Sequence, residues 1–137
     1  MITLQQKQNL ITATKDALNN PYIKESKNKF TAAVLTSKGN IYSAVSYFSD
    51  TYSLTLHGEQ AALSHAASHG ECEIVAMAIA SSENKKTGEF TNPCHMCKQL
   101  LYESQKRSGI SMLVILTNNH NETKEILLSK MISYPWP

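Results

Sequence analysis

Pro93-Cys94-His95-Met96-Cys97, together with His57-Gly58-Glu59 upstream, is the stretch around which the rest of the chain is organised. The two cysteines are three residues apart at the start of a predicted helix, so their thiols lie on one face and reach a single ion. A third ligand has to come from elsewhere, and His57 supplies a nitrogen of the right type. The pattern predicts a metal ion held by His57, Cys94 and Cys97, with the carboxylate of Glu59 close by.

The composition limits the size of the fold and the choice of partners. With 137 residues, of which 42% are hydrophobic and 18% charged, the chain is long enough for one core and too short for two ordinary domains. We therefore predict a single domain over residues 1–137. The net charge of +2 gives no strong field, and the densest basic cluster, Lys24, Lys27 and Lys29, is interrupted by Glu25. This pattern argues against nucleic acid as a partner.

The N-terminal segment and the cysteines indicate the cellular compartment. Residues 1–17 are polar and helical in pattern, with no apolar run long enough for a signal peptide or a membrane span. We therefore expect a cytoplasmic protein without membrane association. In that compartment, three cysteines with two of them in C-x-x-C favour metal or redox chemistry over a disulfide framework. Cys72, the third, is expected to be a small, partly buried residue.

The hydrophobic pattern predicts alternating helices and strands. β-Branched segments on either side of Lys38-Gly39-Asn40 indicate a hairpin, and Ile74–Ala80 is apolar enough for a central strand covered on both faces. The predicted elements are a helix from the cap Thr3 to about Asn19, strands 30–36 and 41–48, a helix from Gly58 to about Gly70, strand 74–80, a helix from the cap Asn92 with Pro93 at its first position to Gly109, and strands 112–117 and 122–127. This order predicts a three-layer α/β/α sandwich around a five-stranded mixed sheet.

The predicted site lies where two of these helices begin. Unpaired N–H groups and the positive end of the helix dipole favour thiolates and a carboxylate there. With three protein ligands, Zn²⁺ keeps its fourth position open for water, as catalytic zinc requires. The order H-x-E followed by P-C-x-x-C is the signature of zinc-dependent deaminases. In this interpretation Glu59 moves the protons of a hydrolytic deamination.

C-x-x-C also has two plainer interpretations. A redox pair needs no upstream H-x-E, and a structural zinc site needs a fourth cysteine or histidine nearby. His95 lies on a different helical face from Cys94 and Cys97, and His120 falls in a turn-like Asn-Asn-His-Asn stretch. The spacing and the helix placement therefore favour catalytic zinc over structural zinc.

The chain resembles the cytidine deaminase family of small tetrameric zinc enzymes over nearly its whole length. Ala32–Thr36 and Ile41-Tyr42 resemble the family's opening hairpin, and Leu56–Leu63 resembles its C-A-E-R-x-A helix start. Pro93–Glu103 is similar to the family's P-C-G-x-C-R-Q-x-L-x-E stretch, which is the most specific match. The resemblance implies a cytidine deaminase-like fold, zinc on the three ligands named above, and the upstream glutamate as proton shuttle.

Departures from the family pattern point to a different site environment and a different substrate. His57 stands where the family has a third cysteine, and Gln60 where it has an arginine. One neutral imidazole and two thiolates leave a Zn²⁺ site neutral, so the two changes compensate electrostatically. Ser46 and Phe48 match the family's ribose-reading Asn and Glu, and Asn28 matches a phenylalanine near the base. We therefore expect an aminated pyrimidine nucleoside or related heterocycle whose sugar is different or absent.

The resemblance also implies partners. Family members are homotetramers that complete each pocket with neighbouring subunits, so Trp136 in the tail is expected either in a neighbour's pocket or on its own domain. Three functions remain open: a deaminase of a small molecule in pyrimidine metabolism or of a blasticidin S-type antibiotic, a deaminase of a base in nucleic acid, and a non-catalytic zinc-binding protein. The near-neutral charge argues against the second, and retention of Glu59 against the third.

Overall fold

The computed structural model describes residues 2–137, folded around a sheet of strand order β2-β1-β3-β4-β5. The strands are β1 (Phe30–Thr36), β2 (Ile41–Val45), β3 (Ile74–Ser81), β4 (Leu113–Thr117) and β5 (Thr123–Leu127). The α-helices are α1 (Leu4–Asp16), α2 (Gly58–Ser68) and α3 (His95–Ser108), and the 3₁₀ turns are η1 (Ala17–Asn19), η2 (Pro21–Ile23), η3 (Tyr52–Leu54) and η4 (Leu128–Lys130). This is the predicted α/β fold with a five-stranded mixed sheet.

The strand directions bring several chain ends to one edge of the sheet. β1 pairs antiparallel with β2 and β3, and β4 pairs parallel with β3 and antiparallel with β5. The start of β1 and the carboxyl ends of β2, β3 and β4 therefore lie at the same edge. In open α/β sheets, sites form at the carboxyl ends of the strands. Helices α2 and α3 both begin at this edge, because the former follows β2 and the latter follows β3.

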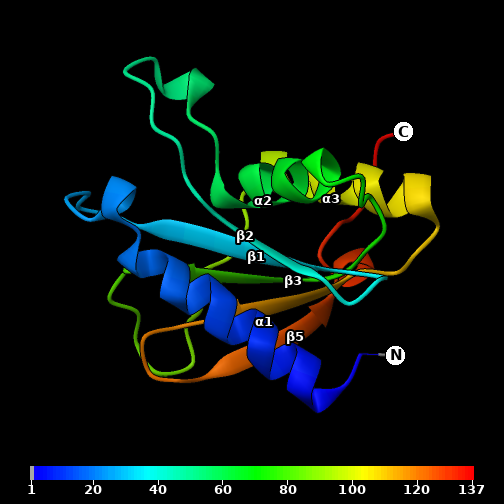
Figure 1. Cartoon of the computed structure of the whole chain (residues 1–137), viewed down its shortest axis with the longest axis horizontal. Coiled ribbons are helices and arrows are strands. Elements are labelled where there is room, and N and C mark those ends of the chain that lie inside the picture. The colour runs from blue at the N-terminus through cyan, green and yellow to red at the C-terminus, as the bar shows by residue number, and fades with distance from the viewer. Residues whose placement is uncertain (1) are drawn as a thin grey trace.

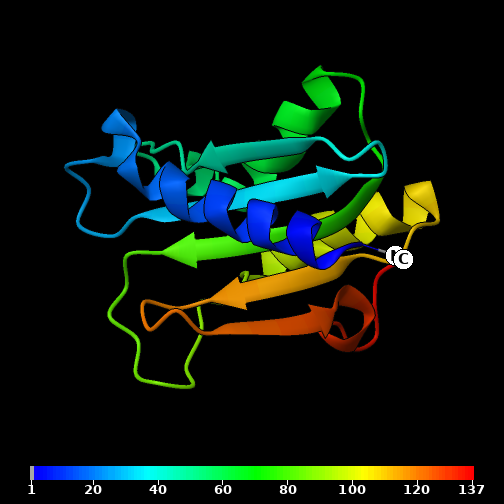
Figure 2. The ribbon, with the colours of Figure 1, turned by 60° about the horizontal axis from the view of Figure 1, so that its bottom comes forward.

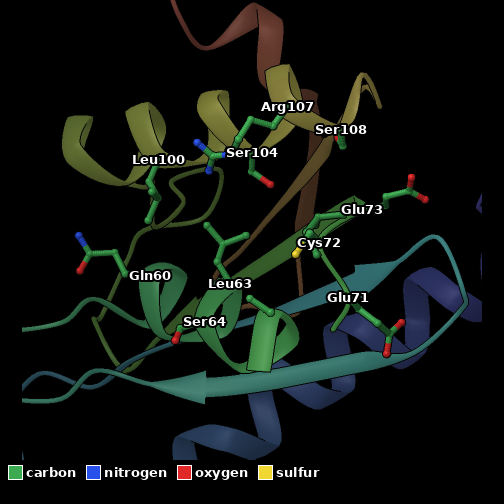
Figure 3. Close-up of a pocket in the computed structure, with 12 residues that line it drawn as sticks. Gln60, Leu63, Ser64, Glu71, Cys72, Glu73, Leu100, Ser104, Arg107 and Ser108 are labelled. Atoms are coloured by element: carbon green, nitrogen blue, oxygen red, sulfur yellow. The ribbon is translucent and has the colours of Figure 1, made fainter. Parts of the chain in front are cut away.

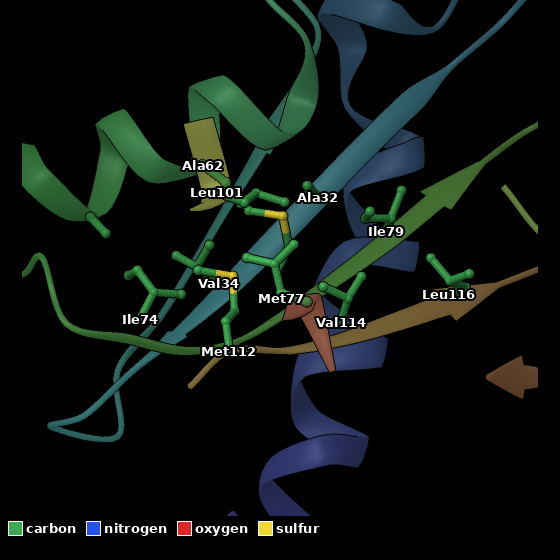
Figure 4. Packing of buried hydrophobic residues seen from close by; sticks show 12 residues of the cluster. Ala32, Val34, Ala62, Ile74, Met77, Ile79, Leu101, Met112, Val114 and Leu116 are labelled. Atoms are coloured by element: carbon green, nitrogen blue, oxygen red, sulfur yellow. The ribbon is translucent and has the colours of Figure 1, made fainter. Parts of the chain in front are cut away.

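Helices cover both faces of the sheet. Helix α1 crosses one face, and α2 with α3 covers the other, as Figures 1 and 2 show. Side chains alternate between the two faces along each strand, so two buried clusters form. One joins Leu10 of α1 to Ile115, and the larger one, in Figure 4, packs Val34 and Met77 against Leu101 of α3. Within residues 2–137, no helix has the length and hydrophobicity needed to span a bilayer.

A buried carboxylate ties the β1–β2 turn to the segment that follows α2. Glu71 accepts hydrogen bonds from Thr36 Oγ1 (2.6 Å), from the hydroxyl of Tyr42 and from Asn40 Nδ2 (2.9 Å). These donors, Thr36 first, lower the pKa of Glu71 because each stabilises the ionised form. The hydrogen bond that Tyr42 donates to Glu71 also raises the pKa of Tyr42. The network fixes the hairpin relative to α2, whose opposite end carries the candidate site.

The second hairpin strand is shorter than predicted. It ends at Val45 instead of Phe48, because β1 begins at Phe30. Ser46 N still donates to the carbonyl of Phe30 at 3.2 Å, but Tyr47 and Phe48 lie beyond the start of β1. Tyr47 instead forms an isolated antiparallel bridge with Leu56, with N···O distances of 2.9 and 2.8 Å. The segment between them projects from the body of the molecule in Figure 1.

The third helix begins later than predicted. Cys94, not Asn92, is its N-terminal cap, and the first helical residue is His95, not Pro93. The reason is that the sulfur of Cys94 accepts the N–H of Cys97 at 3.4 Å, which satisfies one of the free donors of the first turn. One of the candidate metal ligands therefore also caps the helix that carries another.

Candidate metal centre

Two residues that precede helices face each other at the sheet edge described above. His57 immediately precedes α2 and Cys94 immediately precedes α3, and both have extended backbones with ψ of 155° and 169°. The amide of His57 donates to Gln60 Oε1 at 2.8 Å, which fixes the start of α2. Because the first N–H groups of a helix lack helical partners, both ends carry partial positive charge toward the space between them. This placement favours anionic ligands such as thiolates.

The imidazole of His57 meets the two thiols of the third helix. Its Nδ1 lies 3.2 Å from Cys97 Sγ and 3.3 Å from Cys94 Sγ. All three ligand atoms lie within 4.8 Å of one another, and in the part of the chain that the structure describes this is the one such group of three or more His, Cys, Asp or Glu side chains. The three predicted ligands, which come from two segments far apart in the sequence, are therefore brought together.

The donor set suits Zn²⁺ in both chemistry and spacing. Zn–S bonds of about 2.3 Å and Zn–N bonds of about 2.0 Å place tetrahedral ligand atoms about 3.5 Å apart. The nitrogen–sulfur distances of 3.2 and 3.3 Å are close to that value. One imidazole and two thiols are ligands that zinc prefers, whereas magnesium and calcium prefer oxygen. Three protein ligands leave the fourth tetrahedral position for water or substrate.

Glu59 lies beside this cluster without belonging to it. Its side chain is buried in the first turn of α2, with 6% of the residue exposed. Burial raises the pKa of the Cys97 thiol, and Glu59 raises it further through its charge and by accepting a hydrogen bond from that thiol. A divalent cation opposes these effects, because positive charge favours the thiolate. The carboxylate is thus held against one ligand and lies outside the ligand set.

The predicted substrate-binding residues of the hairpin and the preceding loop differ in exposure. Ser46 is buried, and its Oγ donates to the carbonyl of Phe30 at 3.4 Å. Phe48 is 40% exposed, and Asn28 is exposed in the loop before β1. Over residues 2–137, none of these three side chains is hydrogen-bonded to the three ligand atoms or to Glu59. Among the described residues, the structure therefore links none of the three to the cluster by a hydrogen bond.

The C-terminal tail lies along its own α3. Gln99 Nε2 donates to the carbonyl of Trp136 at 2.6 Å, and Tyr102 and Lys106 donate to the carbonyl oxygen of Pro137 at 2.9 and 3.2 Å. Trp136 as a residue remains 75% exposed. The backbone of the tail is thus held in place while its large apolar ring stays free to contact another surface.

An aromatic stack built on Tyr22 was missed by the sequence reasoning. The Tyr22 ring lies parallel to that of Tyr47, with centroids 5.2 Å apart, and close to that of Phe48, with centroids 6.1 Å apart. Its hydroxyl accepts the N–H of Phe48 at 3.1 Å. The contact joins η2 to the segment that follows β2, 26 residues apart, so no local pattern could signal it. Since Tyr47 pairs with Leu56, the stack is tied to the residue just before His57.

A cavity of about 620 Å³ lies between α2 and α3, apart from the three ligand atoms. Leu63, Ile74 and Leu100 give it an apolar lining, and Arg107 of α3 also lines it (Figure 3). Cys72, predicted to be partly buried, is exposed and lines this cavity, because it belongs to the short loop between α2 and β3. It takes no part in the metal cluster.

Known proteins share both the sequence pattern and the fold. Residues 4–115 match the family described as the cytidine and deoxycytidylate deaminase zinc-binding region. A cytidine deaminase from Sporosarcina psychrophila is 30% identical over 123 residues, which cover 90% of this chain and 85% of that protein. The fold is similar to the crystal structures of cytidine deaminases from Burkholderia pseudomallei (TM-score 0.81, 24% identity, 98% of this chain and 100% of that one) and Mycobacterium tuberculosis (TM-score 0.74, 21% identity, 96% and 97%). Family match, curated relative and ligand cluster agree: the chain belongs to the cytidine and deoxycytidylate deaminase family of zinc-dependent hydrolases.

Proposed function

We propose that this protein is a hydrolytic deaminase in which His57, Cys94 and Cys97 hold one zinc ion and Glu59 transfers the protons. The observation that carries the proposal is the convergence of one imidazole nitrogen and two sulfurs beside a buried carboxylate outside the ligand set. A structural zinc site has no use for such a carboxylate, and it commonly has four protein ligands. The pairing of an open coordination position with a non-ligand acid therefore supports catalysis.

The chain's own groups divide the work of the reaction. Zinc, when bound, supplies Lewis acidity and lowers the pKa of coordinated water to about 7. Glu59 accepts a proton from the attacking water and delivers it to the ring nitrogen beside the amino-bearing carbon. It then takes the second proton of that water oxygen and passes it to the amino group, whose bond to the ring carbon breaks. The water oxygen becomes the product's carbonyl oxygen, and ammonia leaves. Cys97, which is fully buried, keeps solvent from the inner side of the site.

The substrate we propose is an aminated pyrimidine nucleoside or related heterocycle whose sugar is different or absent. Phe48 stands where the family has a ribose-binding carboxylate, and Tyr22 stacks beside it. An aromatic ring offers stacking to a flat group and no acceptor to a sugar hydroxyl. Ser46, whose Oγ donates to a backbone carbonyl, and the exposed Asn28 are proposed as further contacts. A nucleoside antibiotic of the blasticidin S type fits the same description.

Deamination of a base in nucleic acid is the second candidate function. Tyr22, Tyr47 and Tyr52 are exposed aromatics of the kind on which unpaired bases stack. A net charge of +2 supplies little attraction for a phosphate backbone, so the small-molecule substrate has better support. A zinc-binding protein without turnover has the least support, since it gives Glu59 no role.

We also propose a homotetramer of single-domain chains that acts in the cytoplasm. The cavity between α2 and α3, with Leu63 and Leu100 in its lining, is an apolar surface that a second copy can cover. The exposed Trp136 ring at the end of a fixed tail is suited to wall a neighbour's pocket. Cell fractionation with an epitope-tagged chain checks the compartment.

The zinc assignment predicts one zinc ion per chain in the purified protein. Cys97→Ser and His57→Ala each remove a ligand atom and are expected to lose most of that zinc, measured by mass spectrometry of the metal after dialysis against a chelator. Cys72→Ser and His95→Gln are matched controls that keep the metal, because neither side chain belongs to the cluster. Full zinc retention in both ligand variants would contradict the assignment.

The proton-transfer role predicts that Glu59→Gln keeps zinc and fold but loses about 10²–10⁴-fold in kcat, since the amide cannot exchange protons. Ammonia release by the parent and the variant, with zinc content and circular dichroism as controls, measures this. Ammonia release by the variant at the parental rate would show that another group handles the protons.

The substrate proposal predicts that cytidine is a poorer substrate than an aminated heterocycle with a different or absent sugar. A panel of cytosine, cytidine, deoxycytidine, their phosphates, aminated purines and blasticidin S is compared by kcat/KM for ammonia release. Phe48→Glu is expected to raise kcat/KM for cytidine about tenfold, because it offers a charge-assisted hydrogen bond to a sugar hydroxyl. Tyr52→Glu, another exposed aromatic, is the matched control. If the kcat/KM of the parent enzyme were higher for cytidine than for every other compound of the panel, this prediction would be refuted.

The oligomer proposal predicts a light-scattering mass close to that of four chains. Leu63→Asp and Leu100→Asp, which place a charge in the lining of the α2–α3 cavity, are expected to yield smaller species because a charge is costly to bury. Ile11→Asp on α1, a partly buried residue of the opposite face, serves as the control for a general loss of stability. A monomeric parent protein would exclude the tetramer.

A further inference from the structure

We propose that Gly58 is a positioning residue: the absence of a side chain there sets how His57 presents its Nδ1 to the two thiols of α3. The proposal rests on the proposed role of His57 as a zinc ligand. Gly58 is buried between that ligand and the proton-transferring Glu59, in the first turn of α2. It makes no contact with the metal itself, so any effect it has on the site acts through the residues on either side.

The first turn of α2 lies directly on the backbone of β1. A Cβ at position 58 would be 3.1 Å from three backbone atoms, the nitrogen of Ala32 and the carbonyl carbon and Cα of Thr31. Ordinary van der Waals contact of a Cβ begins at about 3.4 Å, so a methyl group there requires a shift of a few tenths of an ångström. Gly58 is not among the residues with positive φ, so the position requires glycine for space and not for backbone conformation.

Strand β1 is not free to make that shift. Thr31 pairs with Val45 of β2 on one side and Ala80 of β3 on the other, and Ala32 is paired on both sides in the same way. Thr31 and Ala32 are also fully buried. A methyl group at position 58 therefore displaces the start of the helix and leaves the strand where it is.

Displacing the start of α2 changes the metal centre because the ligands come from two helices. His57 and Glu59 move with α2, whereas Cys94 and Cys97 stay with α3. Metal–ligand distances in proteins vary by only about 0.2 Å. The displacement expected for the start of α2 is at least as large. An imidazole is also directional, because the metal must lie in the ring plane along the lone pair of the nitrogen. A thiolate sulfur accepts a metal over a wider range of directions.

The same face of α2 provides a matched control. Ala62 and Ala66 follow Gly58 at intervals of four residues and are fully buried, so they also hold the helix close to the sheet. Ala66 is two turns from the metal centre. Ala66→Val crowds the same interface without moving a residue next to a ligand, and it is expected to lower stability while leaving zinc affinity unchanged.

The experiment measures the zinc dissociation constant of each variant by competition with a fluorescent chelator, and the urea midpoint of the metal-free protein separately. Gly58→Ala is expected to weaken zinc binding about tenfold or more, the range seen when a residue that orients a ligand is changed. In a His57→Cys background, the same Gly58→Ala change is expected to weaken zinc binding much less, because the thiolate tolerates the displacement.

Each outcome decides for or against the proposal. An unchanged zinc affinity in folded Gly58→Ala overturns it, and so does an equal loss of affinity in the parent and in the His57→Cys background. If the single variant Gly58→Ala does not fold but the double variant with His57→Cys does, the result supports a coupling between Gly58 and His57. If the double variant does not fold either, Gly58 serves only the packing of α2 on β1, and the proposal is overturned. A parent protein that binds no zinc refutes the proposed function itself, and this is seen before any variant is made.

Discussion

The convergence of two helix N-termini on one edge of the sheet is the constraint on which the site depends. β1 runs antiparallel to both β2 and β3, so the chain leaves β2 and β3 at the same edge and enters α2 and α3 there. The ligands of α3 are local neighbours, but the imidazole of His57 reaches them only because the sheet sets the distance between the two helix starts. The fold thereby fixes a geometry between His57 and Cys94, which stand 37 positions apart along the chain.

The charges of the site explain why it needs a cation and why one imidazole and two thiolates suit Zn²⁺. Two cysteine sulfurs lie within hydrogen-bonding distance of one imidazole, next to a buried carboxylate, and burial already opposes ionisation of Cys97. Two thiolates balance the two charges of Zn²⁺, which leaves the charge of Glu59 uncompensated by the ligand set. Gln60 suits such a neutral site, because its side-chain oxygen accepts the amide of His57 and brings no charge of its own.

The helices and strands could be predicted from the periodic spacing of hydrophobic residues. Most of the features that were predicted wrongly or not at all depend on tertiary contacts. Hydrophobic spacing identified the helices and strands, and two short motifs identified the three side chains that meet in the candidate metal centre. The predicted start of α3 was wrong because Asn is a preferred cap, whereas Cys94 caps through a sulfur, a weak acceptor that propensity scales rank low. The end of β2 depends on where its partner β1 begins, and the stack of Tyr22 on Phe48 joins residues 26 positions apart. Neither property is encoded in a local window.

In our proposal the reaction and the choice of substrate depend on different parts of the molecule, and this explains why the reaction was easier to infer than the substrate. Deamination needs few atoms at fixed spacing, and these sit on the first turns of two helices packed against a rigid sheet. The substrate contacts that we propose lie in the segment from Ser46 to Leu56, which is largely exposed and joined to η2 by the contacts of Tyr22 with Tyr47 and Phe48. Such loops change without disturbing the core, because they contribute little to its packing. In our proposal, Phe48 in place of the family's sugar-reading carboxylate therefore changes which molecule binds, while the chemistry at the bound amino group stays the same.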